Sequence, residues 1–238
     1  MPDGASMPAA SPPPAPVTGL VIQARLDSTR LPGKSLLPLG GRPLILRVMQ
    51  AFREAPWQVR VLACPADCAA AFGPLAAEAG FALLEGPKDD VLARYALAAR
   101  RFALDRIVRV TGDNPFTFPD AAAALAREAE LLGADYAGYT GLPYGAGAEV
   151  ISAEALFRAE ALAEQPFERE HVCPYLYTHP EQFLLHRPLA PRRWQAPALR
   201  LSVDTIQDYD RAAALYAALD FSGGPFPPGE TIIAAAGK

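Results

Sequence analysis

Short apolar runs alternate with longer amphipathic stretches over the first half of the chain. Residues 19–24 (GLVIQA) are a compact apolar run typical of a buried strand, and residues 43–54 carry Leu44, Val48 and Phe52 at helical spacing. The same alternation predicts strands over residues 58–64, 81–86 and 105–113, and helices over residues 66–79, 91–102 and 119–132. Short strands alternating with helices of this length predict an α/β fold with a mostly parallel sheet.

The alternation changes after residue 136. A glycine-rich stretch over residues 138–150 leads into a strand that begins at Glu149. Beyond it, the pattern predicts helices over residues 153–163, 167–179 and 205–219, and strands over residues 182–189 and 199–204. We interpret residues 139–193 as a small excursion from the main sheet, suited to contacts with a substrate or a second subunit.

Both ends of the chain differ in composition from its middle. Residues 1–18 are rich in Pro and Ala and lack the basic and apolar regions of a signal peptide, so they predict a disordered tail. Residues 222–238 predict a second tail, which leaves one domain over residues 19–221. No apolar run approaches the roughly 18 residues that span a bilayer, so we expect no membrane partner.

Charge and cysteine content narrow the class of function. The formal net charge of −4 argues against a nucleic-acid partner, because such proteins usually carry a basic surface. Three cysteines do not make a disulfide framework, which favours a cytoplasmic location. Cys64 and Cys68 have a spacing seen in metal sites, but no second pair of Cys or His residues is placed to complete a zinc tetrahedron. We expect reduced, half-buried thiols.

The loop after the first expected strand, residues 23–35 (QARLDSTRLPGKS), combines basic residues with Pro and Gly. Its Gly-Lys-Ser ending suggests a Walker A phosphate loop, but that motif requires glycine where this chain has Ser28, so we reject it. In a parallel α/β fold, ligands bind beyond the carboxyl ends of the strands, where Arg25, Arg30 and Lys34 would point. Three cations suit a triphosphate, and a solvated basic loop is the alternative.

Two aspartates end strands that are far apart in the sequence. Asp113 ends the strand expected over residues 105–113, and Asp204 ends the strand expected over residues 199–204. Mg²⁺ prefers one or two carboxylates together with phosphate oxygens and water, so this pair predicts a site for a magnesium-bound nucleotide. The alternative is that Asp113 closes a turn with Asn114 and that Asp204 caps the following helix. No Ser-His-Asp or Cys-His spacing suggests a covalent nucleophile.

Five segments of the chain match the motifs of one known family. They are residues 21–45 (VIQARLDSTRLPGKSLLPLGGRPLI), 89–95 (DDVLARY), 108–116 (VRVTGDNPF), 168–183 (EREHVCPYLYTHPEQF) and 201–209 (LSVDTIQDY). In this order they resemble the acylneuraminate cytidylyltransferase-like family, which includes the 3-deoxy-manno-octulosonate and sialic-acid cytidylyltransferases. The resemblance is strongest to the spore-coat polysaccharide biosynthesis branch, and it covers residues 19–219.

The resemblance implies a single nucleotidyltransferase-type, Rossmann-like α/β domain that forms a homodimer. It also implies Mg²⁺-dependent transfer of CMP from CTP to an acidic sugar acceptor, with release of pyrophosphate. By resemblance, the triphosphate-binding loop includes Arg25, Ser28, Arg30 and Lys34. Of these, Lys34 and Arg30 would stabilise the leaving pyrophosphate, while Asp113 and Asp204 would hold the metal. Asp27 departs from the family, which commonly has glycine there, and an extra carboxylate is unfavourable unless it faces solvent or a cation.

Other residues are weaker candidates. The resemblance places Glu149 near the acceptor sugar, where it would accept hydrogen bonds from hydroxyl groups, although an edge-strand surface glutamate is the alternative. Arg169 or His171 would meet the acceptor's carboxylate, with a structural role as the alternative. Asp90 and Arg94 are spaced i, i+4 and would pair on one helical face. Relatives place this element near the nucleotide, so both are also candidates for nucleotide binding.

Two other functions stay open. A nucleotide-sugar-dependent glycosyltransferase is one, since related folds use an Asp-x-Asp metal motif, whereas the GDNP sequence supplies only Asp113. A non-catalytic nucleotide-binding paralogue is the other, and the presence of Arg25, Lys34, Asp113 and Asp204 speaks against it. The identity of the acceptor is also left open.

Overall fold

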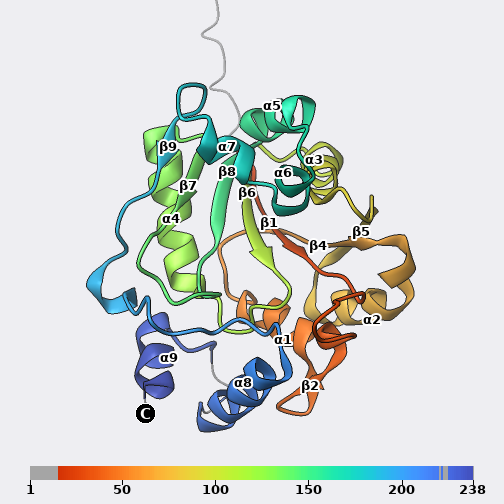
Figure 1. The fold of residues 1–238 in the computed structure, drawn as a ribbon, viewed down its shortest axis with the longest axis vertical. Coiled ribbons are helices and arrows are strands. Elements are labelled where there is room, and N and C mark those ends of the chain that lie inside the picture. The colour runs from red at the N-terminus through yellow and green to blue at the C-terminus, as the bar shows by residue number, and fades with distance from the viewer. Residues whose placement is uncertain (1–15, 220, 222–224, 238) are drawn as a thin grey trace, which may run out of the picture.

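The computed structural model describes residues 16–219, 221 and 225–237, and a seven-stranded sheet forms its centre (Figure 1). The strand order is β5-β4-β1-β6-β8-β7-β9. These strands are β1 (Thr18–Gln23), β4 (Val59–Pro65), β5 (Ala82–Gly86), β6 (Arg106–Thr111), β7 (Tyr136–Gly138), β8 (Glu149–Ser152) and β9 (Leu185–His186). The first four in spatial order run parallel, and β8 is antiparallel to both of its neighbours. The prediction of a mostly parallel sheet is confirmed.

Helices cover both faces of the sheet. They are α1 (Leu44–Ala51), α2 (Ala69–Ala79), α3 (Val91–Arg101), α4 (Pro119–Leu132), α5 (Ala153–Leu162), α6 (Pro166–His171), α7 (Pro174–Thr178), α8 (Ile206–Ala218) and α9 (Gly229–Ala236). Short elements complete the chain: β2 (Pro38–Leu39), β3 (Arg42–Pro43) and the 3₁₀ turns η1 (Lys34–Leu36), η2 (Ala66–Cys68) and η3 (Arg192–Trp194). Leu20 and Ile22 of β1 join the hydrophobic core that includes α1, α2, α4, α8 and α9. Val21 joins the core that includes α3, α5 and α7, because successive strand side chains point to opposite faces.

Local signals in the sequence set several helix ends. Asp90 caps the start of α3, as its position before the apolar stripe predicts. Thr205 and Asp208 form a capping box at the start of α8. Helix α4 begins at Pro119 and ends where Gly133 takes the left-handed conformation, with φ of 62°.

The region of residues 139–193 is more closely built into the sheet than the sequence suggests. Strand β8 lies inside the sheet between β6 and β7, and β9 forms one edge of it. The single helix expected over residues 167–179 is wrong, because α6 ends at His171 and the φ of 72° at the next residue, Val172, is incompatible with a continuing helix. Pro174 then starts α7.

The segment of residues 199–204 is extended but forms no strand of the sheet, which corrects the expectation of a strand there. The Leu201 amide donates to the Tyr144 carbonyl at 2.7 Å, and the Val203 amide donates to the Asp113 carbonyl at 2.9 Å. The segment is therefore paired with the glycine-rich loop and with the turn after β6.

The predictions of a tail at each end of the chain have different outcomes. Residues 1–15 of the tail expected over residues 1–18 lie outside the described residues. The C-terminal tail expected over residues 222–238 is wrong in part, because it contains α9, whose Ile232 is fully buried in the core shared with α4 and α8. None of the helices in the described residues combines the length and apolar character needed to cross a membrane.

Candidate active site

A cleft of about 710 Å³ opens at the carboxyl ends of β1 and β6. Its walls come from the loop after β1, the turn after β6, the glycine-rich residues 138–149 and the α6–α7 region. Ligands of parallel α/β sheets bind at this position, and the volume is in the range of small-molecule sites. The basic loop and both aspartates singled out in the sequence line this cleft.

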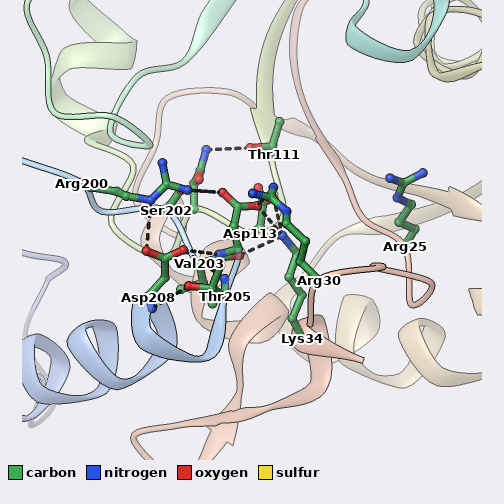
Figure 2. Close-up of polar contacts among 12 residues, drawn as sticks. Arg25, Arg30, Lys34, Thr111, Asp113, Arg200, Ser202, Val203, Thr205 and Asp208 are labelled. Carbon is green, nitrogen blue, oxygen red and sulfur yellow. Dashed lines mark hydrogen bonds and ion pairs between the residues drawn. The ribbon is translucent and has the colours of Figure 1, made fainter. Parts of the chain in front are cut away.

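Lys34 lies at the centre of a cluster of ion pairs in the cleft (Figure 2). Its ammonium donates hydrogen bonds to Asp113 Oδ2 at 2.8 Å, to Asp204 Oδ1 at 3.1 Å and to the Val203 carbonyl at 2.8 Å. Arg30 forms an ion pair with the same Asp204 Oδ1 at 2.9 Å. The fold thus brings together four predicted site residues from three distant parts of the chain.

The end of β6 places Asp113 next to Lys34. The Gly112 amide donates to the Gln23 carbonyl at 2.7 Å, and a Cβ on Gly112 would lie 2.7 Å from that same oxygen. Glycine is therefore needed where the ends of β1 and β6 approach each other. Asn114 closes the turn, with its side-chain amide 2.6 Å from Thr111 Oγ1. Asp113 is left to face the cleft.

Asp204 is buried, and both of its carboxylate oxygens accept hydrogen bonds. Oδ1 faces Lys34 and Arg30, while Oδ2 accepts from Arg200 and from the Ser202 hydroxyl, the latter at 3.0 Å. Burial alone would raise the pKa of Asp204, but the hydrogen bonds and the positive charges outweigh burial and lower it. The carboxylate is therefore ionised at neutral pH.

Asp208 holds the segment that carries Asp204. Its Oδ2 accepts the backbone amides of Asp204 at 3.1 Å and Thr205 at 3.0 Å, and its Oδ1 accepts from Arg200 at 3.0 Å. Burial raises the pKa of Asp208, but these partners outweigh it and lower the pKa to about 2. Because Thr205 and Asp208 cap α8, Asp204 is not needed as a helix cap.

The pair of aspartates fits a magnesium ion bound together with a nucleotide. Both carboxylates approach one cationic group, the Lys34 ammonium, so they lie close enough to approach another cation together. Among the described residues, no group of three or more His, Cys, Asp or Glu side chains could hold a metal. Mg²⁺ usually takes one or two carboxylates and completes its shell with phosphate oxygens and water, so two suffice.

Arg25 lies apart from the Lys34 cluster (Figure 2). It is about half exposed and forms long ion pairs with Asp27 at 3.7 Å and with Glu170 at 3.4 Å. Asp27 also pairs with Lys88 at 3.1 Å. Asp27 therefore faces cations, the condition under which an extra carboxylate is tolerated in this loop. Ser28 lines the cleft as well.

Glu149 lies on the other side of the cleft, in β8. It forms an ion pair with Arg109, its register partner on β6, and its Oε1 accepts the Tyr136 hydroxyl at 2.7 Å. Burial, followed by the charge of Glu149, raises the pKa of Tyr136, so the phenol stays protonated and donates. Glu149 is therefore part of a buried network and is not an edge-strand surface residue.

Cys173 and His171 also line the cleft on this side. Burial and then the charge of Glu149 raise the pKa of the Cys173 thiol well above its usual value, so it is a poor nucleophile at neutral pH. His171 lies against the ring of Phe167, with ring centroids 4.5 Å apart.

Three of the predicted site residues, Asp90, Arg94 and Arg169, are held by contacts within the protein. Arg169 forms an ion pair with Asp90, with Nε 2.7 Å from Oδ2, and donates to the Glu160 and Ala163 carbonyls at 2.9 Å. The predicted Asp90–Arg94 pair is therefore wrong. Buried Arg94 instead donates to the carbonyls of residues 87 and 88. Neither Asp90 nor Arg169 lines the cleft.

The model of a family described as cytidylyltransferase matches residues 20–225. The chain belongs to this cytidylyltransferase family. The spore coat polysaccharide biosynthesis protein SpsF of Bacillus subtilis is 32% identical to it over 205 residues, which are 82% of this chain and 85% of that protein. A 3-deoxy-manno-octulosonate cytidylyltransferase of Anaeromyxobacter dehalogenans is 36% identical over 108 residues, or 44% of each chain. The fold is shared with a cytidylyltransferase structure from Leptospira borgpetersenii, with a TM-score of 0.85, 24% identity, and coverage of 92% of this chain and 93% of that one.

Sequence reasoning missed several residues of this cytidylyltransferase cleft. Arg200 and Asp208 orient Asp204, and the capping-box spacing of Thr205 and Asp208 was a readable signal for part of this arrangement. Arg109 lies between the buried Val108 and Val110 in β6, and a charged residue there requires a partner. Nothing in the sequence identifies that partner as Glu149, because the two residues meet only through the register of β6 and β8.

Proposed function

We propose that the protein transfers CMP from CTP to an acidic sugar acceptor and releases pyrophosphate. The observation that carries this proposal is the cluster of Lys34, Arg30, Asp113 and Asp204 at the carboxyl ends of β1 and β6. Membership of the cytidylyltransferase family supports CTP as the donor. The octulosonate acceptor in the name of one relative supports a sugar acid as the acceptor.

The chemistry is an in-line displacement at the α-phosphorus. A hydroxyl oxygen of the acceptor forms a bond to this phosphorus, and the bond from phosphorus to the oxygen that bridges it to the β-phosphate breaks. Pyrophosphate leaves with that oxygen, and the hydroxyl proton is released to water. Little covalent chemistry is asked of the protein, so its work is positioning and charge stabilisation.

Lys34 and Arg30 are suited to stabilise the leaving pyrophosphate. Both hold carboxylate oxygens within hydrogen-bonding distance, and each can exchange such an oxygen for a phosphate oxygen of the same charge type. Asp113 and Asp204 would hold Mg²⁺, which when bound neutralises phosphate charge that builds up in the transition state. Arg200 and Ser202 keep Asp204 oriented throughout.

The proposal is tested by a pyrophosphate-release screen with the wild-type protein. Each of ATP, CTP, GTP and UTP is combined with Mg²⁺ and a panel of sugar acids and their neutral counterparts, and products are identified by mass spectrometry. The expected result is release that depends on CTP, on a sugar acid and on Mg²⁺, with formation of a CMP-sugar. Release with a different nucleotide, or sugar transfer from a preformed nucleotide sugar, would overturn it.

A further inference from the structure

The positive side chains that line the cleft differ in how their charges are used. Apart from His171, they are Arg25, Arg30, Lys34, Arg94, Arg109 and Arg187. Lys34 and Arg30 form ion pairs with Asp204. Arg109 forms an ion pair with Glu149. Arg94 donates its hydrogen bonds to two backbone carbonyls. Arg25 faces the exposed carboxylates described above.

Arg187 is the exception within the described part of the chain, where its guanidinium forms neither a hydrogen bond nor an ion pair. It follows β9 directly, is exposed, and has its guanidinium carbon 5.3 Å from the centre of the Tyr177 ring. A guanidinium over an aromatic face is held in place without using its hydrogen-bond donors. Arg187 therefore lines the cleft with donors that no described residue uses.

The surroundings leave the charge of Arg187 uncompensated. Glu149 is a nearby carboxylate on this side of the cleft, but its two oxygens are taken by Arg109 and by the Tyr136 hydroxyl. Burial is the largest cause that raises the pKa of Tyr136 and Tyr177, and the charge of Arg187 acts against that rise at both phenols. The charge of Arg187 thus acts on this wall of the cleft, and no described residue there serves as its counterion.

The position of Arg187 separates it from the phosphate loop. Lys34 and Arg30 follow β1, whereas Arg187 follows β9, and strands β6, β8 and β7 lie between them. Four strand spacings of about 4.8 Å separate β1 from β9. A triphosphate held at Lys34 and Arg30 does not extend across that distance, so an anion at Arg187 belongs to a second ligand.

We propose that Arg187 binds the acidic group of the acceptor and thereby makes the enzyme prefer acids over neutral sugars. The inference rests on the proposed function. A carboxylate matches the two parallel N–H donors of a guanidinium, and the contact with Tyr177 reduces the entropy lost when the anion binds. The sequence suggested this role for Arg169 or His171, but the Arg169 guanidinium is already paired with Asp90.

The test compares wild type with Arg187→Met and Arg187→Lys. Methionine preserves packing against Tyr177 but removes the charge, and lysine keeps the charge without the fork. Arg192→Met is the matched control, because Arg192 is also exposed but does not line the cleft. Each variant is assayed with the best acid from the pyrophosphate screen and with the carboxamide of the same sugar. Circular dichroism and thermal unfolding establish that each variant is folded.

Arg187→Met is expected to lower kcat/KM for the acid by about 10- to 100-fold, mainly through KM. The KM for CTP and kcat/KM for the carboxamide should change less than about threefold, and Arg187→Lys should fall in between. Equal losses with acid and carboxamide, an unchanged acid KM, or a loss confined to CTP would overturn the role of Arg187. These outcomes leave the proposed function standing if wild type still makes a CMP-sugar. A wild type that uses no sugar acid overturns the proposed function and this inference with it.

Discussion

At the β1 end of the cleft, Lys34 and Arg30 meet the carboxylates of Asp113 and Asp204, whereas at the β9 end Arg187 meets no carboxylate among the described residues. Between them, Arg109 and Glu149 neutralise each other in a buried pair. The first arrangement is an exchangeable one, in which phosphate and a divalent cation can replace lysine–carboxylate contacts. The Arg109–Glu149 pair and Arg187 form a different arrangement, in which the buried pair is fixed and the guanidinium of Arg187 is paired with no described carboxylate. The comparison indicates that the β1 end, which is the proposed nucleotide end, is organised by charge pairs, and that the β9 end, which is the proposed acceptor end, presents a charge with no partner among the described residues.

The fixed pair is expected to give the largest effect when broken. Glu149→Leu leaves Arg109 buried without a counterion and should lower the free energy of unfolding by about 3–5 kcal/mol. Urea denaturation measures this loss. In the double variant with Arg109→Met, both charges are removed and much of the loss should be recovered. A double variant as unstable as Glu149→Leu would show that the pair is not what this side of the cleft depends on.

The exchangeable cluster should matter more for turnover. Asp113→Ala and Asp204→Ala each remove a carboxylate beside Lys34, and pyrophosphate release should fall by about 10²- to 10³-fold. Asp27→Ala is the matched control, since Asp27 lies in the loop that carries Lys34 but outside the cluster. Its rate of pyrophosphate release should stay within about threefold of wild type. Near-normal rates in both cluster variants would contradict the assignment of the nucleotide end.

Acid should weaken the nucleotide end through Asp208. Its pKa is lowered to about 2 in the folded protein, so its contribution is present above the unfolded value near 3.9 and is lost as the pH falls from about 4 to 2. The expected loss is about 2 kcal/mol in the free energy of unfolding. Chemical denaturation at several pH values measures it, and Asp208→Asn should flatten the curve in that window. An unchanged slope in Asp208→Asn would assign the acid sensitivity to other carboxylates.

The smallest predicted effect concerns competition between Lys34 and a divalent cation. The Lys34 ammonium lies between the two carboxylates, so Lys34→Met should strengthen binding of Mn²⁺ in the absence of nucleotide by about tenfold even as turnover falls. Electron paramagnetic resonance of free Mn²⁺ measures the affinity. Adding Asp113→Ala to this variant should remove the gain. Equal affinities in wild type and Lys34→Met would show that the ammonium does not compete with metal.

The sequence predicted the nucleotide end better than the acceptor end, for physical reasons. The apolar run of β1 and the basic loop after it are local signals, and the rule that ligands bind beyond strand ends places Lys34 and Asp113 together. Asp204 was predicted for the right cleft on the wrong element, because the Leu201 and Val203 amides pair with loops and not with a sheet strand. The spacing of apolar residues does not show whether an extended segment pairs with loops or with a strand of the sheet.

Several side chains at or near the β9 end of the cleft depend on contacts between distant segments. Arg169 meets Asp90 across 79 residues, and Arg109 meets Glu149 across 40. Either arginine could satisfy a ligand or a protein carboxylate, and only the packing of α3 against α6 or the register of β6 and β8 decides which. The break between α6 and α7 could have been predicted from the sequence, because Pro174 signals the start of a new helix.

The segment that carries Asp204 has a consequence for biosynthesis. Asp204 meets Lys34 across 170 residues of sequence. A nascent polypeptide emerging from the ribosome exposes the basic loop early, but lacks one of the loop's two carboxylate partners until residue 204 has been added. Translation products that stop before this segment consequently lack a carboxylate on which the proposed reaction depends.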